Sequence, residues 1–369
     1  MDNVKLTIDG IEVEAKQGET ILKAAINAAV YIPALCAHPD LPPAPGIRTG
    51  EIVFQGRKPI ECTDHNYEFE GCQLCIVEIV GREGFHTACN TPVVESMVVH
   101  TDTPDLQRLR QDNLANILTE HPHICLICAQ KGGCSLTQCS SDVPEKERCC
   151  PKFNNCELQK IAEYIGIRED ITRYIHRNLP VIDDEPLIIF DYNLCIGCLR
   201  CVRACQYLQK TGALGFVRHN DRITVGTITP NLKNSHCNFC GACIEVCPTG
   251  ALLDKSEKAK AIRARKLQIS PPVLPPTKLL KFDTHTIDNV PETEGVYQLL
   301  DEQKGTIYIK GTMNLHQELL EQYQTNKETR YFKWEEEPMY TRRESELVQQ
   351  FLQTHGRLPP QNDELADLF

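Results

Sequence analysis

The sequence predicts an α+β fold divided into several small domains. Residues 4–14 alternate between apolar and polar side chains on either side of Asp9-Gly10, which predicts a β-hairpin. Over residues 104–120, leucines and isoleucines recur at helical intervals and predict a helix. Near the middle of the chain, eight cysteines stand in two matched runs, which indicates loops built around metal.

The composition limits the class of protein. The chain has 369 residues, of which 20 are cysteine, and a formal net charge of -11. That acidic balance argues against a general nucleic-acid binder, whose affinity rests on Lys and Arg. We see no secretory leader and no apolar run long enough for a spanning helix, so we expect a cytoplasmic protein without direct membrane insertion. A reducing compartment favours metal ligands over disulfides.

The two cysteine runs have the spacing of a bacterial ferredoxin with two [4Fe-4S] clusters. Each run reads C-x2-C-x2-C-x3-C, and Pro248 follows the second. In this pattern three ligands come from one run and the fourth comes from the other. We therefore assign one cluster to Cys195, Cys198, Cys201 and Cys247, and the second to Cys237, Cys240, Cys243 and Cys205. Zinc sites or disulfides are the alternative, but zinc prefers paired C-x2-C knuckles.

The first hundred residues predict another kind of cluster site. A helical pattern over residues 21–29 follows the hairpin, with Thr20 as its N-cap. A cysteine loop and a C-x2-C pair come next, and an apolar strand over residues 76–80 follows the pair. This order is typical of a β-grasp ferredoxin, and four thiolates suit a [2Fe-2S] cluster. The expected ligands are Cys36, Cys72, Cys75 and Cys89.

Three segments around these cysteines carry a family resemblance: YIPALCAHPDLPP, GCQLCIVEIVG and TACNTPV. They resemble the large iron–sulfur subunit of NADH dehydrogenase (complex I) and related subunits of NAD-linked hydrogenases and formate dehydrogenases. In that family the first cysteine sits much closer to the C-x2-C pair, whereas 35 residues separate Cys36 from Cys72 here. We interpret residues 44–70 as mostly insertion. Cys62 is the alternative first ligand, but the motif surrounds Cys36.

The resemblance also covers a histidine followed by spaced cysteines. The family's motif of one histidine and three cysteines, which ligates a [4Fe-4S] cluster, matches His121, Cys125, Cys128 and Cys134. His121 has the family spacing, with three residues before Cys125, and His123 is the near alternative.

An extra loop then departs from the family pattern. It holds four further cysteines: Cys139, Cys149, Cys150 and Cys156. The family's motif usually runs into a C-x-L-Q helix start, which Cys156 fits slightly better than Cys134, so either residue is a candidate third thiolate. The remaining thiols are expected to hold one more [4Fe-4S] cluster, a zinc ion, or no metal.

The last 85 residues predict a separate small domain. Gly295-Val-Tyr297 and Ile307-Tyr-Ile-Lys-Gly311 resemble the two strands of a GIY-YIG nuclease module, and two helical patterns follow. The family's arginine position, near residues 316–318, holds no arginine, and its glutamate position falls near Val348–Gln349. From His285 onwards, 16 acidic residues oppose 8 basic ones. We expect a degenerate, non-catalytic interaction module.

These motifs divide the chain into five expected segments. They are a β-grasp [2Fe-2S] domain (1–100), a segment with the histidine and cysteine site and the extra loop (101–180), a two-[4Fe-4S] ferredoxin domain (181–254), a basic and proline-rich linker (255–284), and a small α/β domain (285–369).

The expected function is electron transfer through one [2Fe-2S] cluster and three or four [4Fe-4S] clusters. The chain contains no G-x-G-x-x-G signature, so the resemblance implies a flavoprotein NADH-oxidising subunit as one partner. A catalytic oxidoreductase subunit, such as a hydrogenase or formate dehydrogenase, would be the other. Two alternatives remain: a DNA repair protein with structural clusters, and a free-standing polyferredoxin-like donor.

Overall fold

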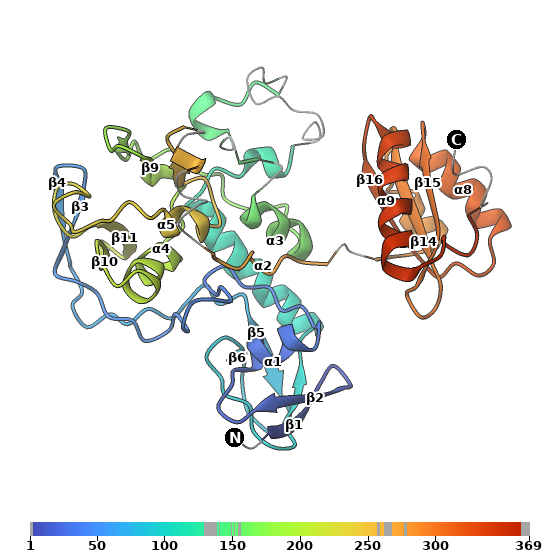
Figure 1. Cartoon of the computed structure of the whole chain (residues 1–369), viewed down its shortest axis with the longest axis horizontal. Coiled ribbons are helices and arrows are strands. Elements are labelled where there is room, and N and C mark those ends of the chain that lie inside the picture. Colours follow the sequence, from blue (N-terminus) through green and yellow to red (C-terminus); the bar gives the residue numbers. More distant parts are fainter. Residues whose placement is uncertain are drawn as a thin grey trace. The chain divides into compact units, whose positions relative to one another are not determined.

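The computed structural model describes residues 3–128, 139, 141–148, 150, 152–153, 156–256, 259–261, 268–276 and 279–362. The chain forms two compact units, Met1–Pro275 and Pro276–Phe369 (Figure 1). No helix in the described part of the chain combines the length and the apolar character needed to cross a membrane.

The first unit begins with a five-stranded sheet in the order β2-β1-β7-β5-β6. Its strands are β1 Asn3–Ile8, β2 Ile11–Lys16, β5 Ile76–Ile79, β6 His86–Thr87 and β7 Val98–His100. Asp9 and Gly10 both have positive φ, 49° and 82°, as the tight turn of the predicted hairpin requires. Helix α1 (Ile21–Asn27) begins at Thr20, whose side chain accepts a hydrogen bond from the backbone of Lys23. The predicted hairpin and helix are both present.

Two helices connect this sheet to the rest of the unit. Helix α2 (Pro104–Thr119) is the predicted helix, and its Leu114 and Leu118 pack in one core with helix α3 (Glu157–Ile165). The same core includes Leu35 and Leu74, which precede two of the predicted ligand cysteines. The helices therefore fix the cysteine loops of the amino-terminal domain.

The ferredoxin region consists of a small sheet and two very short helices. The sheet has the order β12-β9-β8 and is antiparallel, with β8 Val181–Ile182, β9 Ile188–Asp191 and β12 Leu252–Asp254. Helix α4 (Arg200–Arg203) continues into a π-helical turn at Ala204–Leu208, and helix α5 (Ala242–Glu245) lies in the second cysteine run. Single-turn 3₁₀ helices occur at Ile124–Leu126, Glu145–Glu147 and Tyr192–Leu194.

Part of the interpreted insertion forms a hairpin that extends the ferredoxin region. Strands β3 (Ile52–Gln55) and β4 (Lys58–Glu61) join β10 (Leu214–His219) and β11 (Arg222–Thr227) in the order β10-β11-β3-β4 (Figure 1). A Cβ atom on Gly226 would lie 2.5 Å from the carbonyl oxygen of Phe54, so only glycine allows this close approach. The segment between Cys36 and Cys72 therefore contributes to a second sheet.

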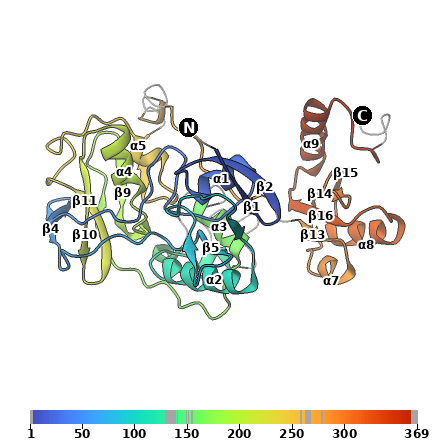
Figure 2. The same ribbon diagram turned by 90° about the horizontal axis from the view of Figure 1, so that it is seen from below.

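The second unit is an antiparallel sheet in the order β13-β16-β14-β15, covered by helices. Its elements are β13 Leu280–Lys281, α7 Thr284–Ile287, β14 Gly295–Leu300, β15 Thr306–Thr312, α8 Leu315–Thr325, β16 Tyr331–Glu336 and α9 Tyr340–His355. Helices α7 and α8 share one core with Tyr297 and Phe332, while α9 packs through Val348 against Val296 and Ile309. Figure 2 shows α9 on one side of the strands and α7 and α8 on the other. Strand β13 lies within residues 255–284, for which the sequence predicts a linker, but it pairs with β16 and so belongs to this unit.

Candidate iron–sulfur centres

The four cysteines predicted for the [2Fe-2S] site lie together. The backbone N–H of Cys72 donates to Sγ of Cys36 over 3.4 Å, and that of Leu35 donates to Sγ of Cys72 over 3.4 Å. Hydrogen bonds from the thiols of Cys72 and Cys89 hold the pKa of Cys36 well below its usual range. The Cys89 thiol also contacts Cys75. The same hydrogen bonds raise the pKa of Cys72 and of Cys89, so the polypeptide alone favours one thiolate in this group, and a bound cation would be needed to stabilise the others.

Cys62 lies elsewhere. It packs against Val53 of β3 and Val217 of β10, inside the hairpin that extends the ferredoxin region. Its Sγ donates to Oγ1 of Thr49 over 3.6 Å. The structure thus brings Cys36, and not Cys62, to the C-x2-C pair.

The eight cysteines of the ferredoxin region are electrostatic neighbours of one another, and their division into two ligand groups stays a prediction. Burial raises the pKa of Cys201, and the next causes are Cys198, Cys195 and Cys247 of its own expected group, followed by Cys243 of the other. Burial likewise raises the pKa of Cys243, whose neighbours include Cys237, Cys205 and Cys240. Burial alone penalises a thiolate, so loading these sites requires a cation that compensates the charge, as iron does.

Backbone N–H groups point at several of these sulfur atoms. Ala213 donates to Sγ of Cys205 over 3.2 Å, and Phe239 donates to Sγ of Cys237 over 3.3 Å. The N–H of Ala242 lies 3.5 Å from Sγ of Cys240. Such donors stabilise thiolates and tune the potential of a ligated cluster.

His121 is buried in a form suited to metal binding. Its side chain is 3% exposed, and burial lowers its pKa to about 4, so the ring is neutral. Nδ1 lies 2.7 Å from the carbonyl oxygen of Pro122. Since a carbonyl only accepts, Nδ1 carries the proton and Nε2 keeps its lone pair. Nε2 is buried without a hydrogen-bond partner.

His123 has a different environment. Its Nδ1 lies 2.8 Å from the carbonyl oxygen of Leu118, near the end of α2, and 3.1 Å from that of His121. Through these contacts the imidazole of His123 hydrogen-bonds to backbone carbonyl groups and stabilises the end of the helix. The geometry therefore favours His121 over His123 as a ligand.

Two cysteines of the extra loop lie beside His121. Cys150 and Cys156 line the same small cavity as the imidazole. Sγ of Cys156 donates to the carbonyl oxygen of Pro248 over 3.4 Å, and Cys150 packs directly against Gly250. Cys125 belongs to the same core as Cys156.

The remaining cysteines of this region do not line the cavity beside His121, or they lie outside the described residues. Sγ of Cys128 lies 3.3 Å from Oγ of Ser141, and Cys139 accepts from the N–H of Val143 over 3.4 Å. Cys134 and Cys149 lie outside the described residues. The ligand choice between Cys134 and Cys156 therefore stays a prediction.

A groove of about 970 Å³ runs beside two of the cysteine loops. Cys72 lies along it, as do Cys195 and Cys198, and its walls come from hairpins β3–β4 and β10–β11 and from helix α2. The groove leaves the loops of two candidate sites approachable from outside the protein.

Comparisons with known families identify two domains in this chain. Residues 1–42 and 46–104 match the family model of a 2Fe-2S iron-sulfur cluster binding domain. Residues 185–253 match the model of the ferredoxin-like domain of NADH-quinone oxidoreductase subunit 3. The chain carries both of these iron–sulfur domains. The resemblance expected from the cysteine motifs is confirmed.

The chain is also similar to curated proteins. The chain is 31% identical over 255 residues to the NADP-reducing hydrogenase subunit HndD of Solidesulfovibrio fructosivorans, covering 69% of this chain and 36% of the relative. It is 32% identical over 262 residues to an NADH-quinone oxidoreductase subunit of Rhizobium meliloti, covering 70% of this chain and 25% of the relative. The chain thus spans only about a quarter to a third of the length of these relatives.

The chain was also compared with solved structures. The crystal structure of NAD+-reducing [NiFe]-hydrogenase in the H2-reduced state is 23% identical, with a TM-score of 0.49, covering 69% of this chain and 88% of that chain.

Proposed function

We propose that this chain is a multi-cluster subunit that relays single electrons between a flavoprotein that oxidises NADH and a catalytic oxidoreductase subunit. Its relatives are subunits of a hydrogenase and of NADH-quinone oxidoreductase, which supports this class of function. The proposal includes one [2Fe-2S] cluster, three or four [4Fe-4S] clusters depending on whether the extra loop binds one, and a cytoplasmic location.

The observation that carries the proposal is that the candidate [2Fe-2S] site and the ferredoxin cysteines share one hydrophobic core. Cys36 of the [2Fe-2S] group lies in the same hydrophobic core as Cys201 and Cys205 of the ferredoxin runs. Cys201 and Cys243, from different ferredoxin groups, are in turn electrostatic neighbours. Clusters bound at these positions would form a continuous series within one compact unit.

The polypeptide contributes ligands, spacing and exclusion of water. Bound iron–sulfur clusters accept and release one electron at a time. The buried thiols, the N–H groups that donate to them and the packed leucines of α2 and α3 hold the sites at fixed separations. The groove beside Cys72 and Cys195 provides a face where a partner's donor or acceptor can approach.

The test is a comparison of the native complex with the isolated chain under anaerobic conditions. NADH should reduce the clusters of the complex, seen as new EPR signals, whereas the isolated chain should respond to dithionite and not to NADH. In a Cys198→Ser complex, NADH should still reduce the flavin, but electrons should fail to reach the catalytic partner. Rapid reduction of the isolated chain by NADH would contradict the proposal.

A further inference from the structure

Two arginines are completely buried between the [2Fe-2S] cysteines and the first ferredoxin run. Arg200 and Arg203, both on α4, are 1% and 0% exposed. They flank Cys201 in the sequence and project toward the loop that carries Cys36. A buried guanidinium is costly unless an opposite charge lies close to it, so the surroundings of each arginine are informative.

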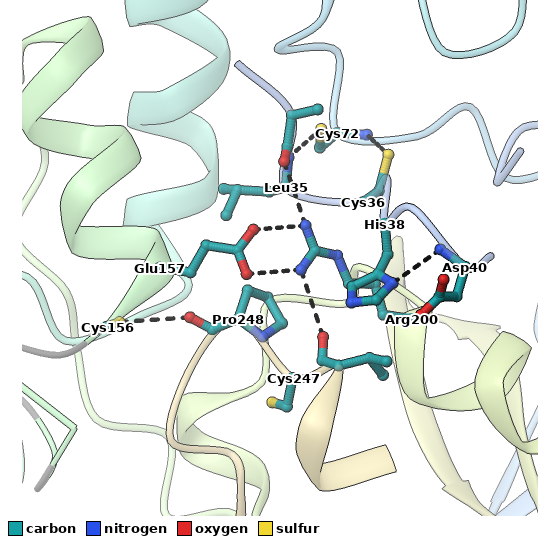
Figure 3. Close-up of polar contacts among 12 residues, drawn as sticks. Leu35, Cys36, His38, Asp40, Cys72, Cys156, Glu157, Arg200, Cys247 and Pro248 are labelled. Atoms are coloured by element: carbon teal, nitrogen blue, oxygen red, sulfur yellow. Dashed lines mark hydrogen bonds and ion pairs between the residues drawn. The ribbon is translucent and has the colours of Figure 1, made fainter. Parts of the chain in front are cut away.

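The charge of Arg200 is balanced. Its two terminal nitrogens each donate to one oxygen of Glu157 on α3, both over 2.7 Å, and the Glu157 side chain is only 8% exposed (Figure 3). Arg200 also reaches the carbonyl oxygens of Ala34 (3.3 Å) and Val246 (3.5 Å). This bidentate pair carries no net charge, and it ties α3 to both cysteine loops.

The charge of Arg203 is not balanced by a carboxylate. Its guanidinium donates to the carbonyl oxygen of Pro42 over 2.5 Å and to that of Cys36. Within the described ranges, no acidic side chain forms an ion pair with it. Its charge lies within electrostatic reach of the thiols of Cys36 and Cys198, which belong to two different candidate sites.

Both arginines also keep an unused donor. The Nε atoms of Arg200 and Arg203 are buried and have no hydrogen-bond partner. Buried N–H groups are nearly always paired, so these donors indicate an acceptor other than the polypeptide. Ligated thiolates and cluster sulfides are acceptors that carry the missing negative charge.

We propose that Arg203 is a positioning residue that tunes the [2Fe-2S] site and the adjacent [4Fe-4S] site together, while Glu157 neutralises the effect of Arg200. The inference rests on the proposed function, because it requires clusters at both sites. The step concerned moves one electron from one site to the other, and no bond is made or broken. The cationic charge of Arg203 stabilises an added electron at either site, so it raises both midpoint potentials.

The experiment is a redox titration of the full-length holoprotein, followed by EPR. Arg203→Gln should shift the midpoints of the [2Fe-2S] signal and of one [4Fe-4S] signal to more negative values, while Arg203→Lys should keep them close to wild type. Glu157→Gln should shift the same two midpoints to more positive values, because it exposes the charge of Arg200. Arg168→Gln removes an exposed positive charge paired with Asp112 and should change neither midpoint.

The opposite signs separate charge tuning from structural damage, which would affect both variants alike. Shifts of equal sign, or no shift in either variant, would overturn the inference. If Arg203→Gln loses iron, the midpoints measured for Arg203→Lys and Glu157→Gln test the inference in its place. If the wild-type protein shows no [2Fe-2S] signal or only one [4Fe-4S] cluster, the proposed function fails instead, and iron analysis distinguishes that result.

Discussion

The backbone N–H of Cys72 lies 3.4 Å from Sγ of Cys36, although 35 residues separate the two cysteines in the chain. The intervening segment leaves this contact, forms the β3–β4 hairpin on another sheet, and returns. The contact shows that Cys36 and Cys72, at the two ends of this segment, lie next to each other.

This arrangement predicts different results for two serine substitutions. Cys36→Ser should abolish or distort the [2Fe-2S] EPR signal, because it removes a ligand. Cys62→Ser should leave the signal intact, since Cys62 packs in the hairpin against Val53 and Val217. The reverse pattern in EPR spectra of the two purified variants would show that Cys62 is the first ligand.

The number of cluster sites predicts the metal content. One [2Fe-2S] and three [4Fe-4S] clusters correspond to about 14 iron atoms per chain, with more if the extra loop is loaded. Anaerobic analysis of iron and acid-labile sulfide measures this value. Removing the iron with a chelator should also lower the thermal stability of the first unit, because ligand binding contributes to folding. A markedly lower iron content in fully loaded protein would contradict the assignment.

The free Nε2 of His121 predicts a specific change in redox potential. His121→Cys should keep its cluster but lower the midpoint, because a thiolate adds negative charge beside the iron. His123→Gln is the matched control and should leave all midpoints in place, since His123 contacts backbone carbonyls near the end of α2. Unchanged midpoints in an EPR-monitored titration of His121→Cys would exclude His121 as a ligand.

The contact between β11 and β3 predicts a strong effect of a single methyl group. Gly226→Ala places Cβ against the carbonyl oxygen of Phe54, so the strands must separate, and we expect a loss of about 1–3 kcal/mol in the free energy of unfolding. Gly215, directly opposite in the register, is the control, because a Cβ there would have ordinary contacts at 3.4 Å and beyond. Thermal unfolding of both variants gives the comparison. Equal melting temperatures would argue against the four-stranded sheet.

The second unit predicts no nuclease activity. Glu318 lies in the region where the GIY-YIG resemblance requires an arginine, and its Oε1 accepts from Oη of Tyr297 (3.3 Å) and from Nζ of Lys310 (2.8 Å). A carboxylate there repels phosphate rather than stabilising it. Incubation of the full chain with DNA and Mg²⁺ should give no cleavage. Deleting residues after Pro275 should leave the iron content unchanged while weakening association with a partner subunit; loss of cluster signals would contradict this.

Local signals explain what the sequence could predict. The turn at Asp9-Gly10 and the cap at Thr20 depend on residues only a few positions apart, and so does the spacing of each cysteine run. Such features can be predicted because all the residues that form them lie within one short stretch of sequence.

Contacts between distant residues explain what it could not. The ion pair of Arg200 with Glu157 joins residues 43 positions apart, and Thr227 of β11 meets Phe54 of β3 across 173 positions. Neither pair has an unusual neighbourhood in the sequence, and Arg203 looks like a surface residue between cysteines. The short strand β13 and its pairing with β16 have no sequence signal either, since two residues carry no periodicity.

The β3–β4 hairpin has a consequence for how the first unit comes apart. Because it starts and ends within the cysteine loop of one domain and adds strands to the sheet of another, the two domains are interlocked by a stretch of chain. A protease cut in the segment between Thr101 and Pro104 would not release an independent amino-terminal fragment. The nicked protein should migrate as one particle and melt in a single cooperative transition, so this ferredoxin cannot be excised as a module without also dismantling its neighbour.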